Sequence, residues 1–399
     1  MEASLGLPRL AGVSRASRPR PVRAGAAAAL AALTAATLAA CSAPASAVPT
    51  APTIDVSVDR CGQGWTDPVP GAERFTLHNS DSRAGEVYLT DAGTGAVYAE
   101  VDPLAAGTTA RMDITLGAGT YAFRCAMEDE QTVIGPDVTV TGGPRTSPSP
   151  VAAVAQADLL DATRQYQAYV SGQLPKLAAL AAALRTDLAH GDLAAARRDW
   201  LPAHLQYERL GAAYGAFGAL DDAVNGLPNG LPKGVADPAW TGFHRLEYGL
   251  WHGQDAATLR PVAERLATDV GRLKTTFETT QIDPLTLALR AHEITENALQ
   301  FELTGRTDFG SGSNLQTVAA NLDGTATVLG ILKPLLISRD PQLPEVFALL
   351  AQARQDAASL PPLAKLTTAQ REKIDAQVGQ LAEDLAPVAS VLEPRRVNQ

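Results

Sequence analysis

Basic residues are scarce in this sequence. Its 399 residues include 33 lysines and arginines against 43 aspartates and glutamates, a formal net charge of −10. No basic patch is evident along the chain, so a nucleic acid is not expected as a partner, because phosphate binding needs concentrated positive charge. An acidic surface favours solubility and attracts cations, but it does not by itself specify a function.

The N-terminal region lacks the run of about 20 strongly apolar residues that spans a membrane. Residues 24–40 (AGAAAALAALTAATLAA) are uncharged and rich in alanine, and five arginines precede them. This order predicts a secretory signal over residues 1–40. The signal ends in LAAC, which resembles a bacterial lipobox and implies that Cys41 is diacylated and becomes the new N-terminus. A plain signal cut after Ala45 or Ala47 is the alternative.

Cysteine and histidine are also few. Removal of the signal and lipidation of Cys41 would leave two cysteines, Cys61 and Cys125, in a chain of net charge −14. A disulfide between them is the expectation for an oxidising compartment, and metal ligation by their thiolates is the alternative. Residues 54–141 hold one histidine, His78, which is too few for a blue-copper centre. The His-Glu-x-x-His motif of zinc peptidases is absent.

The remaining length of about 359 residues predicts two domains. After a tether at residues 41–53, short alternating runs separated by turn residues occupy residues 54–141 and predict a small β-sandwich. Residues 142–155 are rich in glycine and proline and predict a linker. Residues 156–395 have apolar residues at spacings of three and four and predict an all-α bundle. Helices are expected near residues 156–190, 192–219, 237–252, 256–279, 284–304, 314–336, 341–357 and 367–392.

The strongest chemical signal is a pair of His–Glu spacings in this helical part. His244 and Glu247 are three residues apart and so share a helix face, where an imidazole and a carboxylate can hold one cation. His204 and Glu208 stand one turn apart on the preceding predicted helix. If the two helices pack antiparallel, a carboxylate-rich site with an imidazole results, which suits Fe, Mn, Zn or Cu better than Ca or Mg. The expected set is Glu208, Asp221, His244 and Glu247.

Several long motifs resemble the imelysin-like domain of EfeO-type iron-uptake proteins. They are residues 203–209 (AHLQYER), 215–218 (GAFG), 242–253 (GFHRLEYGLWHG), 291–305 (AHEITENALQFELTG) and 321–325 (NLDGT), together with Asn314. The β segment resembles the cupredoxin-like domain of the same family, with Cys61 and Cys125 at its cysteine positions. The resemblance therefore implies a multidomain β + α protein, a cupredoxin-like β-sandwich followed by an imelysin-like helical bundle.

The resemblance also implies a function and a ligand set. Proteins of this type bind iron outside the cytoplasmic membrane and work with a ferrous-iron permease and a haem peroxidase. The expected cargo is iron, with copper or zinc as alternatives, and the expected place is periplasmic or anchored to the cell membrane. The family motifs fall on Glu208, His244 and Glu247, and on Asp221, beside which Asp222 stands. A second metal site is implied at Cys61, Glu86, Glu100 and Cys125, although the segment around Glu100 is less acidic than in the family.

Two other functions fit the same resemblance. Imelysin-like domains have been classed with metallopeptidases, but no general base, open metal and substrate groove are evident together, so an enzyme is not expected. Related proteins have been linked to alginate, and a polysaccharide could stack on Trp200, Trp240 or Trp251. Tryptophans at helical spacing among apolar neighbours are more often core residues.

The lipobox generates the first prediction. Cys41→Ser removes the thiol that would carry the acyl chains, so the protein should move from the membrane fraction to the soluble fraction. Fractionation and immunoblotting of cells that produce each form measure this. Retention of the variant in the membrane fraction would contradict the lipoprotein hypothesis.

Overall fold

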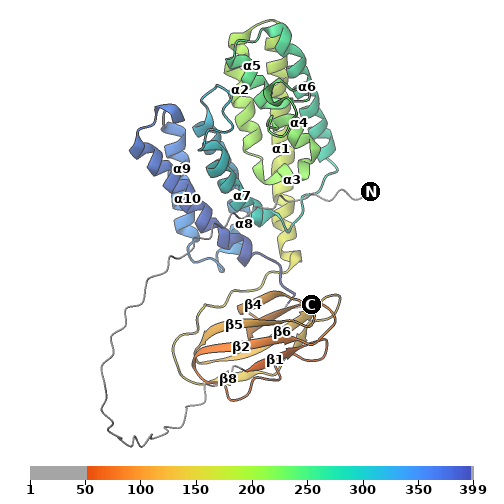
Figure 1. Cartoon of the computed structure of the whole chain (residues 1–399), viewed down its shortest axis with the longest axis vertical. Coiled ribbons are helices and arrows are strands. Elements are labelled where there is room, and N and C mark those ends of the chain that lie inside the picture. Colours follow the sequence, from red (N-terminus) through yellow and green to blue (C-terminus); the bar gives the residue numbers. More distant parts are fainter. Residues whose placement is uncertain (1–51, 397–399) are drawn as a thin grey trace, which may run out of the picture. The chain divides into compact units, whose positions relative to one another are not determined.

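The computed structural model describes residues 52–396. The predicted signal, the lipobox and Cys41 lie outside the described residues, and so does most of the predicted tether. Among the described residues, no helix has both the length and the apolarity that a membrane crossing requires. The predicted order of a β region followed by a helical region is confirmed (Figure 1).

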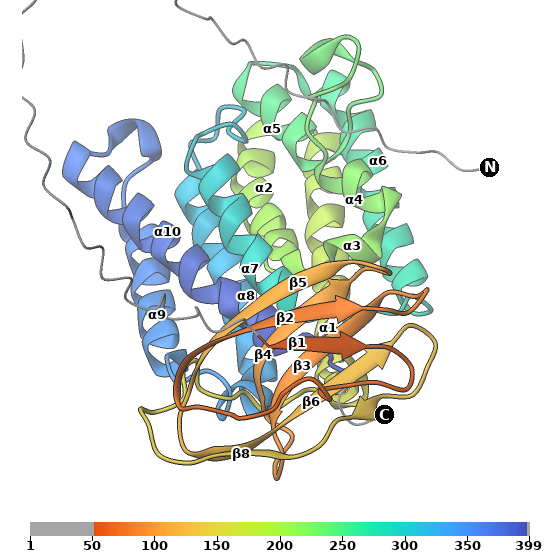
Figure 2. The same ribbon diagram turned by 60° about the horizontal axis from the view of Figure 1, so that its bottom comes forward.

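The β region consists of two facing sheets (Figure 2). One has the order β1-β2-β5, with β1 parallel to β2, and the other has the order β4-β3-β6-β7, with β8 also paired to β6. Alternate side chains point into the space between the sheets, as the sequence alternation requires. The strands are β1 (Thr53–Val56), β2 (Gly71–Asn79), β3 (Gly85–Asp91), β4 (Val97–Leu104), β5 (Thr109–Leu116), β6 (Gly119–Met127), β7 (Val133–Ile134) and β8 (Val138–Val140).

The core between these sheets is aromatic and is closed by a disulfide. Trp65 packs edge-on against Phe75 at 4.9 Å and Phe123 at 5.8 Å between ring centroids. Cys61, in the loop after β1, is bonded to Cys125 of β6, and both residues are fully buried. In this state the two sulfurs are bonded to each other and neither is a thiolate.

The helical region is a bundle of long antiparallel neighbours with several short helices between them (Figure 1). Helix α1 packs along α2 and α6, α8 packs along α7 and α9, and α10 packs along α7 and α9. The long helices are α1 (Gln156–Ala189), α2 (Leu193–Glu208), α5 (Gly242–Trp251), α6 (Ala256–Phe277), α7 (Leu287–Asn297), α8 (Asn314–Leu336), α9 (Leu343–Ser359) and α10 (Thr368–Val391). The short ones are η1 (Gly211–Ala213), α3 (Tyr214–Phe217), α4 (Ala219–Asn225), η2 (Gly234–Ala236), η3 (Ala298–Glu302) and η4 (Leu363–Lys365).

Two predicted helices are interrupted, and both interruptions shape the candidate site. The expected helix at 192–219 ends at Glu208, and the chain then turns through η1, α3 and α4. Gly218 between α3 and α4 has φ +57°, which a glycine adopts without a steric penalty. The expected helix at 284–304 changes after Asn297 into one π-helical turn, η3. Such turns are rare and are found often at functional sites.

The disulfide generates a prediction about stability. Cys61 and Cys125 are 64 residues apart, so their bond restricts the unfolded chain strongly. Replacing both with alanine should lower the free energy of unfolding of the β region by about 2–4 kcal/mol. Denaturant titration followed through aromatic near-ultraviolet circular dichroism measures the change, with Cys41→Ser as the matched control. An unchanged midpoint would show that the sheets do not depend on this bond.

Candidate metal centre

A cavity of about 220 Å³ lies among α2, α4, α5, α7, η3 and α8. Ionisable and amide side chains from several of these elements line it. The polar side chains of the lining are those of Glu208, Tyr214, Asn225, His244, Arg290, Glu293, Asn297, Glu302, Thr307 and Asn321. The sequence predicts that Glu208 and His244 belong to one site, and both residues line this cavity.

The first buried pair lies on α2. His204 Nε2 is 3.0 Å from Glu208 Oε1, and both side chains are almost inaccessible to solvent. The imidazole stacks on Trp200 with 4.8 Å between ring centroids. Within the described residues neither ring nitrogen of His204 has an aligned hydrogen bond. Glu208 is therefore the ion-pair partner of this buried imidazole, at its Nε2.

Two amides hold the Glu208 carboxylate from outside its own helix. Asn225, at the end of α4, donates to Oε1 at 2.8 Å, and Asn321 of α8 donates to Oε2 at 2.7 Å. Burial alone would raise the pKa of Glu208, but the adjacent His204 and the Asn321 amide outweigh it and lower that pKa to about 2. Glu208 is therefore a carboxylate across the physiological range.

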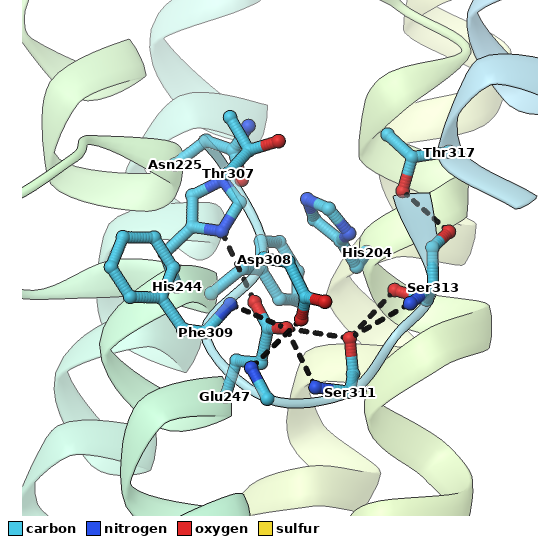
Figure 3. A network of polar contacts seen from close by, with 12 residues as sticks. His204, Asn225, His244, Glu247, Thr307, Asp308, Phe309, Ser311, Ser313 and Thr317 are labelled. Carbon is cyan, nitrogen blue, oxygen red and sulfur yellow. Dashed lines mark hydrogen bonds and ion pairs between the residues drawn. The ribbon is translucent and has the colours of Figure 1, made fainter. Parts of the chain in front are cut away.

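The second buried pair lies on α5 (Figure 3). His244 Nδ1 is 3.3 Å from Glu247 Oε2, and the His244 ring meets the edge of the His204 ring at 5.1 Å between centroids. Burial is the main reason that the pKa of His244 is lowered. The other oxygen of Glu247 accepts hydrogen bonds from the backbone N–H groups of Phe309 and Ser311, both at 3.1 Å, and from the Ser311 hydroxyl.

A third carboxylate reaches the cavity from the π-helical turn. Glu302 is buried, and its Oε2 accepts a hydrogen bond from Asn314 Nδ2 at 2.9 Å. Burial first, and the charge of Glu208 second, raise the pKa of Glu302 to about 7. The pKa values of Glu208 and Glu302 are thus shifted in opposite directions, because His204 forms an ion pair with Glu208 and not with Glu302.

Asp221 lies apart from these groups. Its carboxylate, on α4, accepts a hydrogen bond from the Tyr207 hydroxyl, and it does not line the cavity. Burial raises the pKa of Asp221 to about 6. Its neighbour Asp222 is exposed. The structure places Asp221 next to the site, behind Tyr207, and does not bring it into contact with His244 or Glu247.

No closed coordination sphere exists in the described part of the chain. Over residues 52–396, no three His, Cys, Asp or Glu side chains are arranged so that they could hold a metal ion as they stand. The carboxylates are instead engaged with histidines and amides. A cation could bind only if some of these contacts were broken. The side chains that could then turn towards the cation are those that line the cavity.

The residues expected to form a second metal site have other partners. Cys61 and Cys125 are joined in the disulfide. Glu86 Oε1 accepts from Arg396 Nε at 3.0 Å, and Glu100 accepts from Arg395 Nε at 2.6 Å and from Arg395 Nη2 at 2.9 Å. Carboxylates paired with arginine and sulfurs in a disulfide are not free ligands.

Comparison with known proteins agrees with this architecture. Residues 162–388 match the family model described as imelysin, peptidase M75. The chain belongs to the imelysin family. It is 27% identical over 330 residues to the iron uptake system component EfeO of Yersinia pseudotuberculosis serotype I. It is 28% identical over 334 residues to that of Yersinia pestis and 26% identical over 334 residues to that of Escherichia coli K12. Each match covers 81% of this chain and 86% of the relative, and the predicted resemblance to EfeO-type proteins is confirmed.

The tryptophans considered for sugar stacking are not on the surface. Trp200 is fully buried and Trp240 is 4% exposed. Trp251 is half-buried and packs edge-on against Trp200 at 5.5 Å between centroids. These rings form part of the core around the candidate metal centre, so they offer no stacking platform.

Sequence reasoning missed Glu302 and gave no role to Asn321, although both fall in quoted motifs. A signal was present. Glu302 continues the apolar spacing of Ala291, Ile294 and Ala298, where a carboxylate would be buried. Helix α8 likewise carries a stripe of buried polar residues at spacings of three and four: Asn314, Thr317, Asn321 and Thr325.

The raised pKa of Glu302 generates a prediction about pH. Its folded-state pKa of about 7 exceeds the ordinary 4.5, so its contribution to stability is full below pH 4.5 and is lost as the pH rises through 7. Glu302→Gln removes this loss. In the metal-free protein the variant should match the wild type near about pH 5 and exceed its free energy of unfolding by about 2 kcal/mol near about pH 8. Thermal unfolding at both pH values measures this, and equal differences at both would contradict the assignment.

Proposed function

We propose that this chain is the metal-binding component of an iron uptake system, that it captures iron in the cavity described above, and that it delivers the ion to a membrane permease. The observation that carries the proposal is that two buried His–Glu pairs and a third buried carboxylate meet around one cavity. The relatives named as iron uptake components align with most of the chain, which supports iron as the cargo.

The free-energy cost of burying these carboxylates favours a bound cation in the cavity. Burying ionised carboxylates away from water costs several kcal/mol each unless partners compensate. Glu302 has only neutral hydrogen-bond donors within reach and responds by holding its proton near neutral pH. An iron ion between Glu302 and Glu208 would neutralise both carboxylates. Oxygen and imidazole nitrogen donors in one site suit iron, manganese or zinc.

The orientation of His244 fits metal binding. Glu247 lies at His244 Nδ1, which leaves Nε2 as the ligand atom, the usual way in which a carboxylate fixes a metal-binding imidazole. Glu247 is itself held by the chain at residues 309–311. In this proposal the ligands are Glu208, His244 and Glu302. Glu247 orients His244, His204 supports Glu208, and Asp221 stays with Tyr207.

The setting of this function rests on the resemblance and on the predicted signal. We propose that the protein works outside the cytoplasmic membrane, anchored through Cys41, beside a ferrous-iron permease and a haem peroxidase. Capture and release of an ion need no bond cleavage, so the proposal assigns no enzymatic activity. The peptidase label of the family is not carried over, because the sequence has no His-Glu-x-x-His motif.

Anaerobic titration of the purified chain with ferrous iron, followed by calorimetry, tests the proposal. The wild type should bind one ion in the helical region. His244→Gln and Glu208→Gln should each weaken binding by at least about tenfold, because loss of one charged or imidazole ligand removes more than about 1.4 kcal/mol. Circular dichroism should show unchanged helicity.

His190→Gln serves as the matched control, because His190 is exposed at the end of α1 and does not line the cavity. It should bind iron as the wild type does. Absence of binding by the wild type would contradict the proposed function. Equal affinities of the wild type, His244→Gln and Glu208→Gln would show that iron binds elsewhere.

A further inference from the structure

The cavity also contains a positive side chain. Arg290 of α7 lines it together with Glu208, His244 and Glu302, and among its described lining residues Arg290 carries the one guanidinium or ammonium group. The side chain is 34% exposed, so it lies where the cavity meets solvent. Arg290 Nη1 donates a hydrogen bond to Glu293 Oε2 at 2.5 Å, which leaves the other N–H donors of the guanidinium for a further acceptor.

A guanidinium is out of place in a site built only for a bare cation. Two positive charges in one partly buried cavity repel each other, and such repulsion is stronger there than in water. The same group is well suited to a carboxylate, because its planar fork donates two parallel hydrogen bonds. The lining combines the carboxylates of Glu208 and Glu302 with the guanidinium of Arg290 and its ion-pair partner Glu293, and a lining of both charges matches a ligand that carries both charges.

The size of the cavity agrees with this. About 220 Å³ is several times the share of liquid volume that one water takes, about 30 Å³. The side chains placed to bind the ion number three, Glu208, His244 and Glu302, and an iron site of this kind keeps open positions. Those positions and the remaining volume can accept a small chelating molecule.

Neighbouring residues hold the Arg290 side chain at the cavity. A Cβ atom on Gly215, in α3, would come within 2.8 Å of Arg290 Nη2, so the glycine makes room for the guanidinium. Glu293 fixes the same group from one turn along α7. Both contacts hold the arginine at the cavity instead of leaving it free in solvent.

We propose that the cavity binds iron together with a small dicarboxylate anion, with one carboxylate on the open positions of the metal and the other on Arg290. This inference rests on the proposed function and names the chemical form of its cargo. The anion neutralises part of the ion's charge and bridges it to the protein at the cavity mouth.

The test uses oxalate as the dicarboxylate and acetate as the monocarboxylate. The full mature chain is first titrated with ferrous iron in anaerobic buffer free of carboxylate and carbonate. Oxalate is then titrated into the iron-loaded and the iron-free protein by calorimetry, and gel filtration with metal analysis follows both ligands. Oxalate should bind the iron-loaded wild type at least about tenfold more tightly than the iron-free form, and iron and oxalate should elute with the protein in equal amounts.

Arg290→Gln should weaken oxalate binding to the iron-loaded protein by at least about tenfold while iron affinity without oxalate stays within about threefold. Gly215→Ala, which displaces the guanidinium without removing it, should act in the same direction. Acetate should bind at least about tenfold more weakly than oxalate, because one carboxylate cannot reach both the metal and the arginine.

Several results would overturn the inference. They are failure of oxalate to bind, removal of iron from the protein by oxalate, equal binding of oxalate by wild type and Arg290→Gln, and equal binding of acetate and oxalate. The first step separates this inference from the proposed function. Loss of iron binding there contradicts the function, whereas iron binding without oxalate binding contradicts only the dicarboxylate.

Discussion

The carboxylate of Glu208 is the group on which the arrangement of the cavity depends. Its two oxygens accept hydrogen bonds from α4 and α8, and His204 lies against it within α2. A buried carboxylate is tolerated only when partners compensate for the lost water, so each of these elements must arrive in register for the charge to be accommodated. The same requirement fixes the walls of the cavity, because Asn225, Asn321 and Glu208 all line it.

The pKa values of two carboxyl groups that line the cavity, those of Glu208 and Glu302, are shifted in opposite directions. Glu208 stays ionised because a histidine and amides surround it, whereas burial and the charge of Glu208 raise the pKa of Glu302 to about 7. Uptake of a cation would therefore displace a proton, and the affinity for metal should rise with pH. The loop at residues 309–311 belongs to the same unit, since its backbone holds Glu247 against His244.

Much of this could be read from the sequence, and the exceptions have physical reasons. Alternation and helical spacing predicted the β region and the long helices, because burial of apolar faces dominates both. The His–Glu spacing on α5 placed His244 and Glu247 on one face. Glu302 was missed although its spacing from Ile294 and Ala298 indicates a buried position, because the π-helical turn that carries it depends on packing against other helices. Asp221 was expected among the ligands because two helices were taken to pack antiparallel and because the family resemblance implied an aspartate there, whereas its carboxylate accepts a hydrogen bond from Tyr207.

The segment that comprises α7 and the π-helical turn η3 both packs against α10 and lines the cavity. In a regular helix each residue advances by about 100°, so one extra residue in a turn rotates everything after it by that angle. Helix α7 packs along α10 and also lines the cavity through Arg290, Ile294 and Asn297, and Glu302, the last residue of the turn, lines the same cavity. Deletion of a single residue within 298–301 would restore a uniform helix and rotate the Glu302 carboxylate about the helix axis by about 100°, although no proposed ligand would have been mutated. The site is thus encoded in the length of the segment as well as in its side chains.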